Sequence, residues 1–166
     1  MSFSLSLLPE LDTELASLRK CLERLPGDRF GFQPHPRSMT LGQLATHVAQ
    51  MPLWGATTIN TTELDLSGDF EQPKPRTTAE LLAIFEEGAK NYRAALEGAS
   101  DEDLMVTWSL IGPGRTVILA MPRIAVLRGM VMNHLVHHRG QLSVYMRLLE
   151  IPVPPIYGPT ADEGKS

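Results

Sequence analysis

Two histidines, His134 and His138, lie four residues apart in a stretch whose apolar residues repeat at helical spacing. On a helix this spacing puts both imidazoles on one face, one turn apart, where they can bind one metal ion together. The alternative is a pair of core histidines that are only hydrogen-bonded, and the spacing by itself does not choose between the two. The side chain of His137 points about 100° away from this face and is not part of the pair.

A third imidazole, that of His47, could complete a metal site if its helix packs beside the helix of His134 and His138. Taken alone, His47 is better interpreted as a boundary histidine that is bonded to a carbonyl or to water. Pro52, one turn later, should kink or locally loosen this helix. Three protein ligands would leave coordination positions open, which is typical of a reactive site. We assign no general base, since the residues between His134 and His138 lack the glutamate of an H-E-x-x-H motif.

The elements that must position these histidines are predicted from hydrophobic periodicity and capping motifs. Four amphipathic helices are expected: one carries leucines from 8 to 25, one begins at the capping box Thr40–Gln43, one begins at the capping box Thr77–Glu80, and the last spans 121–150. The predicted fold is therefore all-α, a four-helix bundle in a single domain over residues 1–166.

The connections between these helices differ in character. A long polar connection, residues 64–76, joins the second helix to the third. Two β-prone runs, 105–110 and 116–119, flank a Gly-Pro-Gly turn before the last helix. They are consistent with a short hairpin or with an irregular crossover, and the sequence leaves both open. After the last helix, prolines make the chain extended, and its apolar residues predict a tail that lies along the helices.

One face of the last helix, opposite the histidines, is small or apolar where a solvated helix would be charged. It carries Gly129, Met132, Val136, Gly140 and Ser143. Because a glycine costs about 1 kcal/mol in a helix interior, close approach of another backbone would account for the two glycines. We expect this face to pack on a second subunit, so that the protein is a homodimer.

Composition excludes several classes of function. A net charge of −4 and the absence of a Lys/Arg run argue against nucleic-acid binding. No apolar run approaches the roughly 20 residues of a membrane span, and the first residues lack the features of a signal peptide. The one cysteine, Cys21, cannot form an internal disulfide and is expected to be a packed thiol, so a reducing cytoplasm is the expected location.

The stretch NHLVHHRGQLSVYMRLLEIPVPPIYGPTADE, residues 133–163, resembles the C-terminal signature of the DinB/YfiT family of metalloenzymes. This is the damage-inducible family and not the polymerase that shares its name. The resemblance rests on H-x-x-x-H-R-G-Q in the last helix and P-x-I-Y-G-P in the tail. It implies a four-helix bundle in which one histidine of the second helix and two of the fourth hold a divalent metal ion. The matching positions are His47, in L-A-T-H-V-A, with His134 and His138.

The resemblance also implies a class of function. Relatives include thiol-dependent S-transferases and a maleylpyruvate isomerase, which implies a metal-dependent hydrolase or thiol-dependent transferase with an unknown small-molecule substrate, for which a low-molecular-weight thiol is one candidate. Three imidazoles suit zinc or nickel. The alternative is a non-catalytic dimeric binding or stress-response module with a structural metal. A cavity that reaches the histidines, lined by Trp54, Trp108 or Tyr145, would favour the enzyme.

Overall fold

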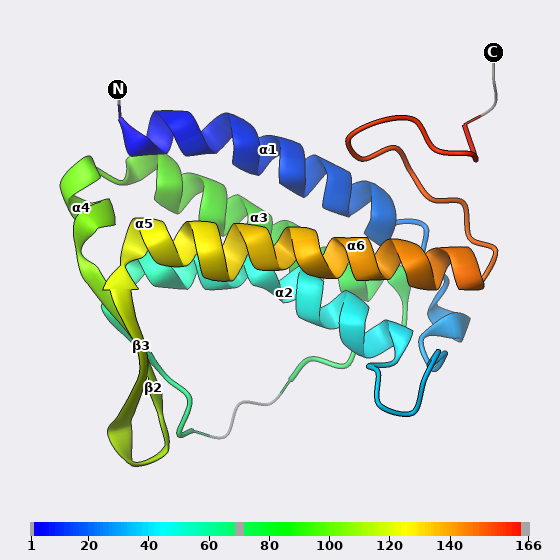
Figure 1. Cartoon of the computed structure of the whole chain (residues 1–166), viewed down its shortest axis with the longest axis horizontal. Coiled ribbons are helices and arrows are strands. Elements are labelled where there is room, and N and C mark those ends of the chain that lie inside the picture. The colour runs from blue at the N-terminus through cyan, green and yellow to red at the C-terminus, as the bar shows by residue number, and fades with distance from the viewer. Residues whose placement is uncertain (1, 69–71, 164–166) are drawn as a thin grey trace.

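The computed structural model describes residues 2–68 and 72–163, and most of this chain is helical. The long helices are α1 (Phe3–Leu22), α2 (Leu41–Asn60) and α3 (Thr78–Gly98). A further long run consists of α5 (Arg123–Val126), η3 (Leu127–Met132) and α6 (Asn133–Leu148). Helix α2 packs against α3 and α6, and α1 also packs against both α3 and α6 (Figure 1). The four helical stretches that periodicity predicted are therefore present.

Both predicted capping boxes begin their helices. At the start of α2, the Thr40 hydroxyl accepts a hydrogen bond from the Gln43 backbone N–H at 3.2 Å, and the Thr40 N–H donates to Gln43 Oε1 at 2.8 Å. Thr77 and Glu80 form the same reciprocal pair at the start of α3. Each box satisfies two N–H groups that have no partner within the helix, so the sequence determines where these helices begin.

A small three-stranded sheet corrects the all-α prediction. Its strands are β1 (Glu63–Asp65), β2 (Thr107–Gly112) and β3 (Thr116–Pro122), in the order β1-β2-β3. The last two pair antiparallel around a 3-10 turn, η2 (Pro113–Arg115), so the hairpin is the correct one of the two alternatives. Gly114 adopts φ = 65°, a left-handed conformation that glycine allows without strain. A short helix, α4 (Asp101–Met105), precedes the hairpin.

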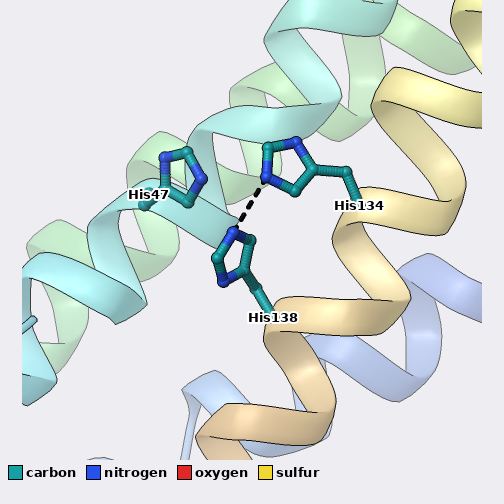
Figure 2. Close-up of side chains that lie close together, drawn as sticks. All are labelled: His47, His134 and His138. Atoms are coloured by element: carbon teal, nitrogen blue, oxygen red, sulfur yellow. Dashed lines mark hydrogen bonds between the residues drawn. The ribbon is translucent and has the colours of Figure 1, made fainter. Parts of the chain in front are cut away.

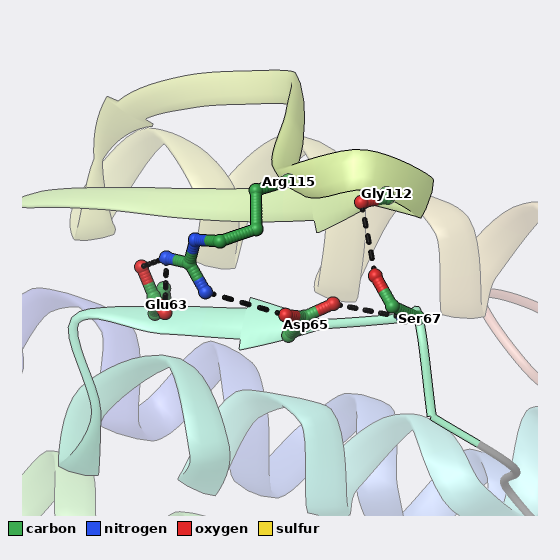
Figure 3. Close-up of polar contacts among 5 residues, drawn as sticks. All are labelled: Glu63, Asp65, Ser67, Gly112 and Arg115. Carbon is green, nitrogen blue, oxygen red and sulfur yellow. Dashed lines mark hydrogen bonds and ion pairs between the residues drawn. The ribbon is translucent and has the colours of Figure 1, made fainter.

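Strand β1 begins one residue before residues 64–76, the stretch that was predicted to be only a polar loop, and overlaps its start. It pairs in parallel with β2, and three residues are too short to show an alternating pattern in the sequence. Polar contacts hold it in place: Arg115 reaches Glu63 at 2.9 Å and Asp65 at 3.3 Å, while the Ser67 hydroxyl donates to the Gly112 carbonyl at 3.1 Å (Figure 3). The strand is therefore created by contacts with residues more than 40 positions later in the chain.

A π-helical segment, η3, interrupts the last helix, which was predicted to be uninterrupted α-helix. Its wider turn changes which residues face inward, because the backbone bonds there span five residues instead of four. Met132, predicted on the outward face, is only 2 % exposed. Gly129 and Gly140 do lie on the surface, and a Cβ atom at either position would have no atom within 4 Å apart from the backbone of its own helix and its chain neighbours. The predicted dimer face is thus smaller than the uniform helix suggested.

The core is formed by the apolar faces of the long helices and closed by the C-terminal tail. Leucines of α1 belong to the same buried cluster as apolar residues of α2, α3 and α6, and Cys21 is fully buried among them, as predicted. Burial raises the pKa of the Cys21 thiol to about 11, so it stays protonated at neutral pH. In the tail, Ile151 and Val153 are buried, which agrees with the prediction that this segment lies along the helices.

A buried ion pair joins the tail to the helices. Arg139 of α6 is 1 % exposed and lies 2.5 Å from a carboxylate oxygen of Glu14 in α1. The Tyr157 hydroxyl accepts a hydrogen bond from Arg139 at 2.6 Å and donates to Glu14 at 2.9 Å. These residues include the arginine of H-R-G-Q and the tyrosine of I-Y-G-P. Both motifs therefore contribute to one structural contact that connects α1, α6 and the tail.

Among the described residues, no helix is both long enough and apolar enough to cross a lipid bilayer.

Candidate metal centre

Three imidazoles meet between α2 and α6. His47 extends from α2, and His134 and His138 extend from successive turns of α6 (Figure 2). The His47 ring centroid lies 5.2 Å from that of His134 and 4.6 Å from that of His138, and the latter two are 4.6 Å apart. One ring nitrogen from each side chain lies within 4.8 Å of the others. The structure therefore brings together the three residues that the sequence singled out.

Local structure explains how each ring reaches this point. The spacing of four residues places His134 and His138 on one face of α6, because a helix turns 3.6 residues per turn. His47 lies in the second turn of α2, after the capping box at Thr40, and α2 continues through Pro52 to Asn60. The packing of α2 against α6 then brings the third ring to the other two.

Hydrogen bonds orient the two α6 imidazoles. His138 Nδ1 lies 2.7 Å from Gln141 Oε1, and His134 Nδ1 lies 3.3 Å from the carbonyl oxygen of Met130. Since these oxygens can only accept, each Nδ1 must carry the hydrogen, and each Nε2 then keeps its lone pair. The two Nε2 atoms are 2.8 Å apart. With hydrogens on both Nδ1 atoms, the two Nε2 lone pairs face each other at this distance, an arrangement that a metal ion bound between them would stabilise.

The amide orientation of Gln141 is supported by a second contact. Its Nε2 group lies 3.1 Å from His137 Nε2, a ring nitrogen that can accept the amide hydrogen. This contact leaves Oε1 facing His138. His137, which the spacing argument left out of the metal pair, therefore supports the arrangement from outside the cluster.

The arrangement fits a divalent ion that is bound by imidazoles. Metal–nitrogen bonds of about 2.1 Å with ligand angles of about 90–109° place ligand nitrogens about 3.0 to 3.4 Å apart. The His134 and His138 Nε2 atoms, at 2.8 Å, would need to separate by only a few tenths of an ångström. No carboxylate belongs to this group among residues 2–68 and 72–163. An ion held there by neutral ligands would keep its full charge.

Burial and proximity keep the imidazoles of His47 and His134 neutral. Desolvation, followed by the neighbouring His138 and His134 rings, lowers the pKa of His47 to about 4. The pKa of His134 is also lowered, chiefly by burial. Only the neutral form of an imidazole can bind a metal ion, so His47 and His134 are in the ligating form at neutral pH.

Two cavities adjoin the cluster. A cleft of about 590 Å³ has His47 in its wall. A smaller, nearly purely apolar pocket of about 110 Å³ is lined by Trp54 and Trp108, and the Trp54 ring lies 5.5 Å from that of His47 and 6.2 Å from that of His134. The expected cavity, one that reaches the histidines and is lined by Trp54, Trp108 or Tyr145, is therefore not found among the described residues: the two tryptophans line the second pocket, which has no histidine in its wall. Tyr145 instead donates its hydroxyl hydrogen to the Met39 carbonyl at 2.9 Å.

Sequence reasoning missed the residues that orient the ligands. Gln141 follows His138 by three positions, a spacing that brings two side chains together on a helix, so its contact with the ring could have been anticipated. The role of the Met130 carbonyl could not, because this carbonyl belongs to the π-helical segment, which the sequence did not predict.

Comparison with known proteins identifies one family and one similar curated protein. The family model described as "DinB family" matches residues 1–165. The uncharacterised protein YrdA of Bacillus subtilis strain 168 is 28% identical over 158 residues, which cover 94% of this chain and 89% of YrdA.

Solved structures show the same fold. A DinB-like protein from Bacillus cereus ATCC 10987 matches with a TM-score of 0.72 and 23% identity over 94% of this chain and 98% of its own. The DinB-like protein YjoA from Bacillus subtilis matches with a TM-score of 0.69 and 18% identity over 92% of this chain and 97% of its own. At these identities the likeness concerns the fold.

Proposed function

The chain belongs to the DinB family, and on this basis we propose that it is a metal-dependent enzyme in which His47, His134 and His138 bind one divalent ion. The observation that carries the proposal is the convergence of three imidazoles from two helices at one point. Zinc or nickel suits such a ligand set best. Three protein ligands leave room for further ligands, which distinguishes a reactive site from a closed structural one.

The proposed reaction is hydrolysis or thiol-dependent group transfer on a small molecule. The bound ion would supply Lewis acidity toward a water molecule or a small-molecule thiol. The chain's own contribution is to bring three ring nitrogens together, to orient the rings of His138 and His134 through Gln141 and the Met130 carbonyl, and to offer a cleft at His47 in which a substrate can lie. We assign no general base and name no specific substrate.

Family membership also supports proposals about the helices that carry the site and about the location of the protein. We take α1, α2, α3 and the α5–α6 run as a four-helix bundle that forms a single domain over residues 1–166, with the sheet as an addition at one end (Figure 1). The ligands then come from facing helices, as is common for metal sites in bundles. A reducing, cytoplasmic location accords with one buried cysteine.

A homodimer through the exposed glycine face of the last helix remains part of the proposal. Gly129 and Gly140 leave space for another backbone to approach. Light scattering at micromolar concentration should give twice the chain mass, and Gly140→Arg should reduce it to that of one chain. A wild-type protein that is monomeric at this concentration would remove the dimer without affecting the metal site.

Metal analysis tests the central proposal. Protein stripped with a chelator and then reloaded with zinc or nickel should contain one ion per chain by elemental analysis. Replacement of His47, His134 or His138 by alanine should lower the affinity by more than the roughly 10–100-fold effect of losing an outer-shell partner. His35→Ala, on an exposed loop, is the matched control. A reloaded wild type without stoichiometric metal would refute the proposal.

The alternative is a binding or stress-response module in which the ion only stabilises the helices. The cleft at His47 disfavours it, because a structural ion needs no access for a small molecule. If the alternative is correct, removing the metal should lower the melting temperature, while small molecules should leave the spectrum of a cobalt-loaded site unchanged. The enzyme instead requires that ligands entering the cleft alter this spectrum.

A further inference from the structure

The cleft beside His47 has a definite composition. It is lined by the loop before α2, by the first turns of α2 and by the connection that leads to α3. On α2, Gln43, His47 and Gln50 follow one another at steps of four and three, so they lie on one face of the helix and point along the cleft. Its volume of about 590 Å³ is in the range of small-molecule sites. A ligand in this cleft would contact His47 directly.

The charged residues of the cleft wall are both cations. Arg37 and Lys74 line it from opposite segments, and within the part of the chain that the structure describes, no carboxylate lines it. Neither cation forms an ion pair with a described residue, whereas seven other arginines of the chain do. The cleft wall is therefore positively charged, although the protein as a whole has a net charge of −4. Charges of one sign that line a concave wall raise the concentration of counter-ions there.

Helix α2 adds to the same potential. Its first turn, from the cap residue Thr40 to Gln43, lies in the cleft wall, and the N-terminus of a helix carries a partial positive charge. Gln43 Oε1 is used in the capping box, so the group that Gln43 has left to offer a ligand is its amide N–H. The cleft thus presents two cations, a positive helix end and an amide donor, all of which favour an anion.

We propose that this cleft binds the anionic group of the substrate, and that the substrate is a small organic anion held by Arg37, Lys74 and the N-terminal end of α2 next to His47. This inference rests on the proposed function, since it names the class of molecule on which the three-histidine site acts. It also explains why Arg37 and Lys74 both line this cleft without an ion-pair partner among the described residues. Bound to them, an anion is held beside the ligand set with its uncharged part free to reach it.

Metal-free protein tests the cleft separately from the ion, because a carboxylate cannot then bind through the metal. The probes are succinate and succinamide, which share size and shape and differ in charge. Binding is followed by shifts of backbone amide NMR signals of residues 37–50 at constant ionic strength. Wild-type protein should bind succinate at least tenfold more tightly than succinamide, and added salt should reduce this preference.

Two double variants locate the effect. In Arg37→Gln/Lys74→Gln the preference for succinate should fall to less than threefold. Lys20→Gln/Lys90→Gln, on exposed faces of α1 and α3 away from the cleft, removes the same charge and should keep the tenfold preference. All four positions are exposed, so folding is not at risk, and thermal melting verifies it.

The outcomes separate the two proposals. A wild-type preference below tenfold, or a cleft variant that discriminates as well as the control variant, overturns the inference. Metal content of the same samples is measured independently. Protein that takes up one ion but shows no charge preference leaves the metal enzyme standing and removes the anionic substrate. Protein that binds succinate selectively but takes up no ion supports the anion cleft and refutes the metal site.

Discussion

The Nδ1 atom of His138 lies 2.7 Å from Gln141 Oε1, and this contact decides which nitrogen of His138 faces the neighbouring imidazoles. Gln141 is not part of the histidine cluster, yet it determines the tautomer of the most buried of the three rings. Its own orientation is supported by His137 at 3.1 Å. The chemistry of the cluster therefore depends on side chains that do not belong to it.

Removal of the Gln141 carbonyl should weaken metal binding without unfolding the protein. In Gln141→Ala, Nε2 of His138 is no longer held as the free acceptor, and we expect a loss of about 10–100-fold in zinc or nickel affinity. Competition with a chelator measures it. Gln141→Glu, which keeps an acceptor oxygen, should retain most of the affinity. Gln50→Ala, a glutamine near His47 but without a bond to a ring, is the control.

The orienting role of Gln141 can also be tested without a metal ion, by measuring the tautomer of His138. Long-range proton–nitrogen NMR spectra of metal-free wild-type protein should show His138 protonated at Nδ1. Gln141→Ala should show a mixture of tautomers. If the two proteins give the same tautomer and the same metal affinity within threefold, Gln141 has no orienting role.

The stability of metal-free protein should fall as the pH is lowered from about 6.5 to about 4. The pKa of His47 is about 4 in the folded chain and 6.5 when unperturbed. In this window the unfolded chain binds a proton that the folded chain does not, so acid favours unfolding and stability rises with pH. The lowered pKa of His134 acts in the same direction.

Thermal melting at several pH values checks this. Since carboxylates also titrate near the acidic end, the difference between wild type and His47→Gln is the quantity to measure. The variant should lose less stability than wild type between pH 6.5 and 4. If stability changes with pH in the same way in the two proteins, the pKa of His47 is not lowered in the folded state.

The ion pair between Arg139 and Glu14 should be worth far more than the surface pairs. Both side chains are at most 9 % exposed, and Glu14→Gln leaves a buried guanidinium without its counter-charge. We expect a loss of about 3–5 kcal/mol in the free energy of unfolding, measured with urea. Arg93→Ala, which breaks an exposed pair with Asp12, should cost less than about 1 kcal/mol. Similar values for the two variants would contradict this interpretation.

Gly55 permits close packing of α2 and α3 next to the site. A Cβ atom at this position would lie 2.6 Å from the Tyr92 ring, which is 1 % exposed and has no room to move away. Gly55→Ala should therefore destabilise the protein by about 1–3 kcal/mol. Gly140→Ala, where no atom lies within 4 Å, should instead be neutral or stabilising by up to about 1 kcal/mol in a single chain. Urea denaturation compares the two, and equal losses would disprove the packing argument.

The local features of this protein follow from its amino-acid sequence. The two capping boxes, the apolar stripes of the long helices and the spacing of His134 and His138 involve residues within four positions of one another, and such contacts form whenever the helix forms. The selection of His47 as third ligand needed more, since its own surroundings also fitted a boundary residue. The family resemblance supplied it, and the structure places its ring 4.6 Å from that of His138.

The remaining features depend on contacts between distant segments. Strand β1 exists because it pairs with residues 109–111, and Met132, which the sequence pattern placed on the outward face, is buried in the core. The cleft at His47 forms only where the connection at residues 72–75 lies opposite α2. Each of these features joins segments that are far apart along the chain, so its free energy depends on contacts between those segments. Hydrophobic periodicity and residue propensity describe only neighbouring residues and therefore could not predict them.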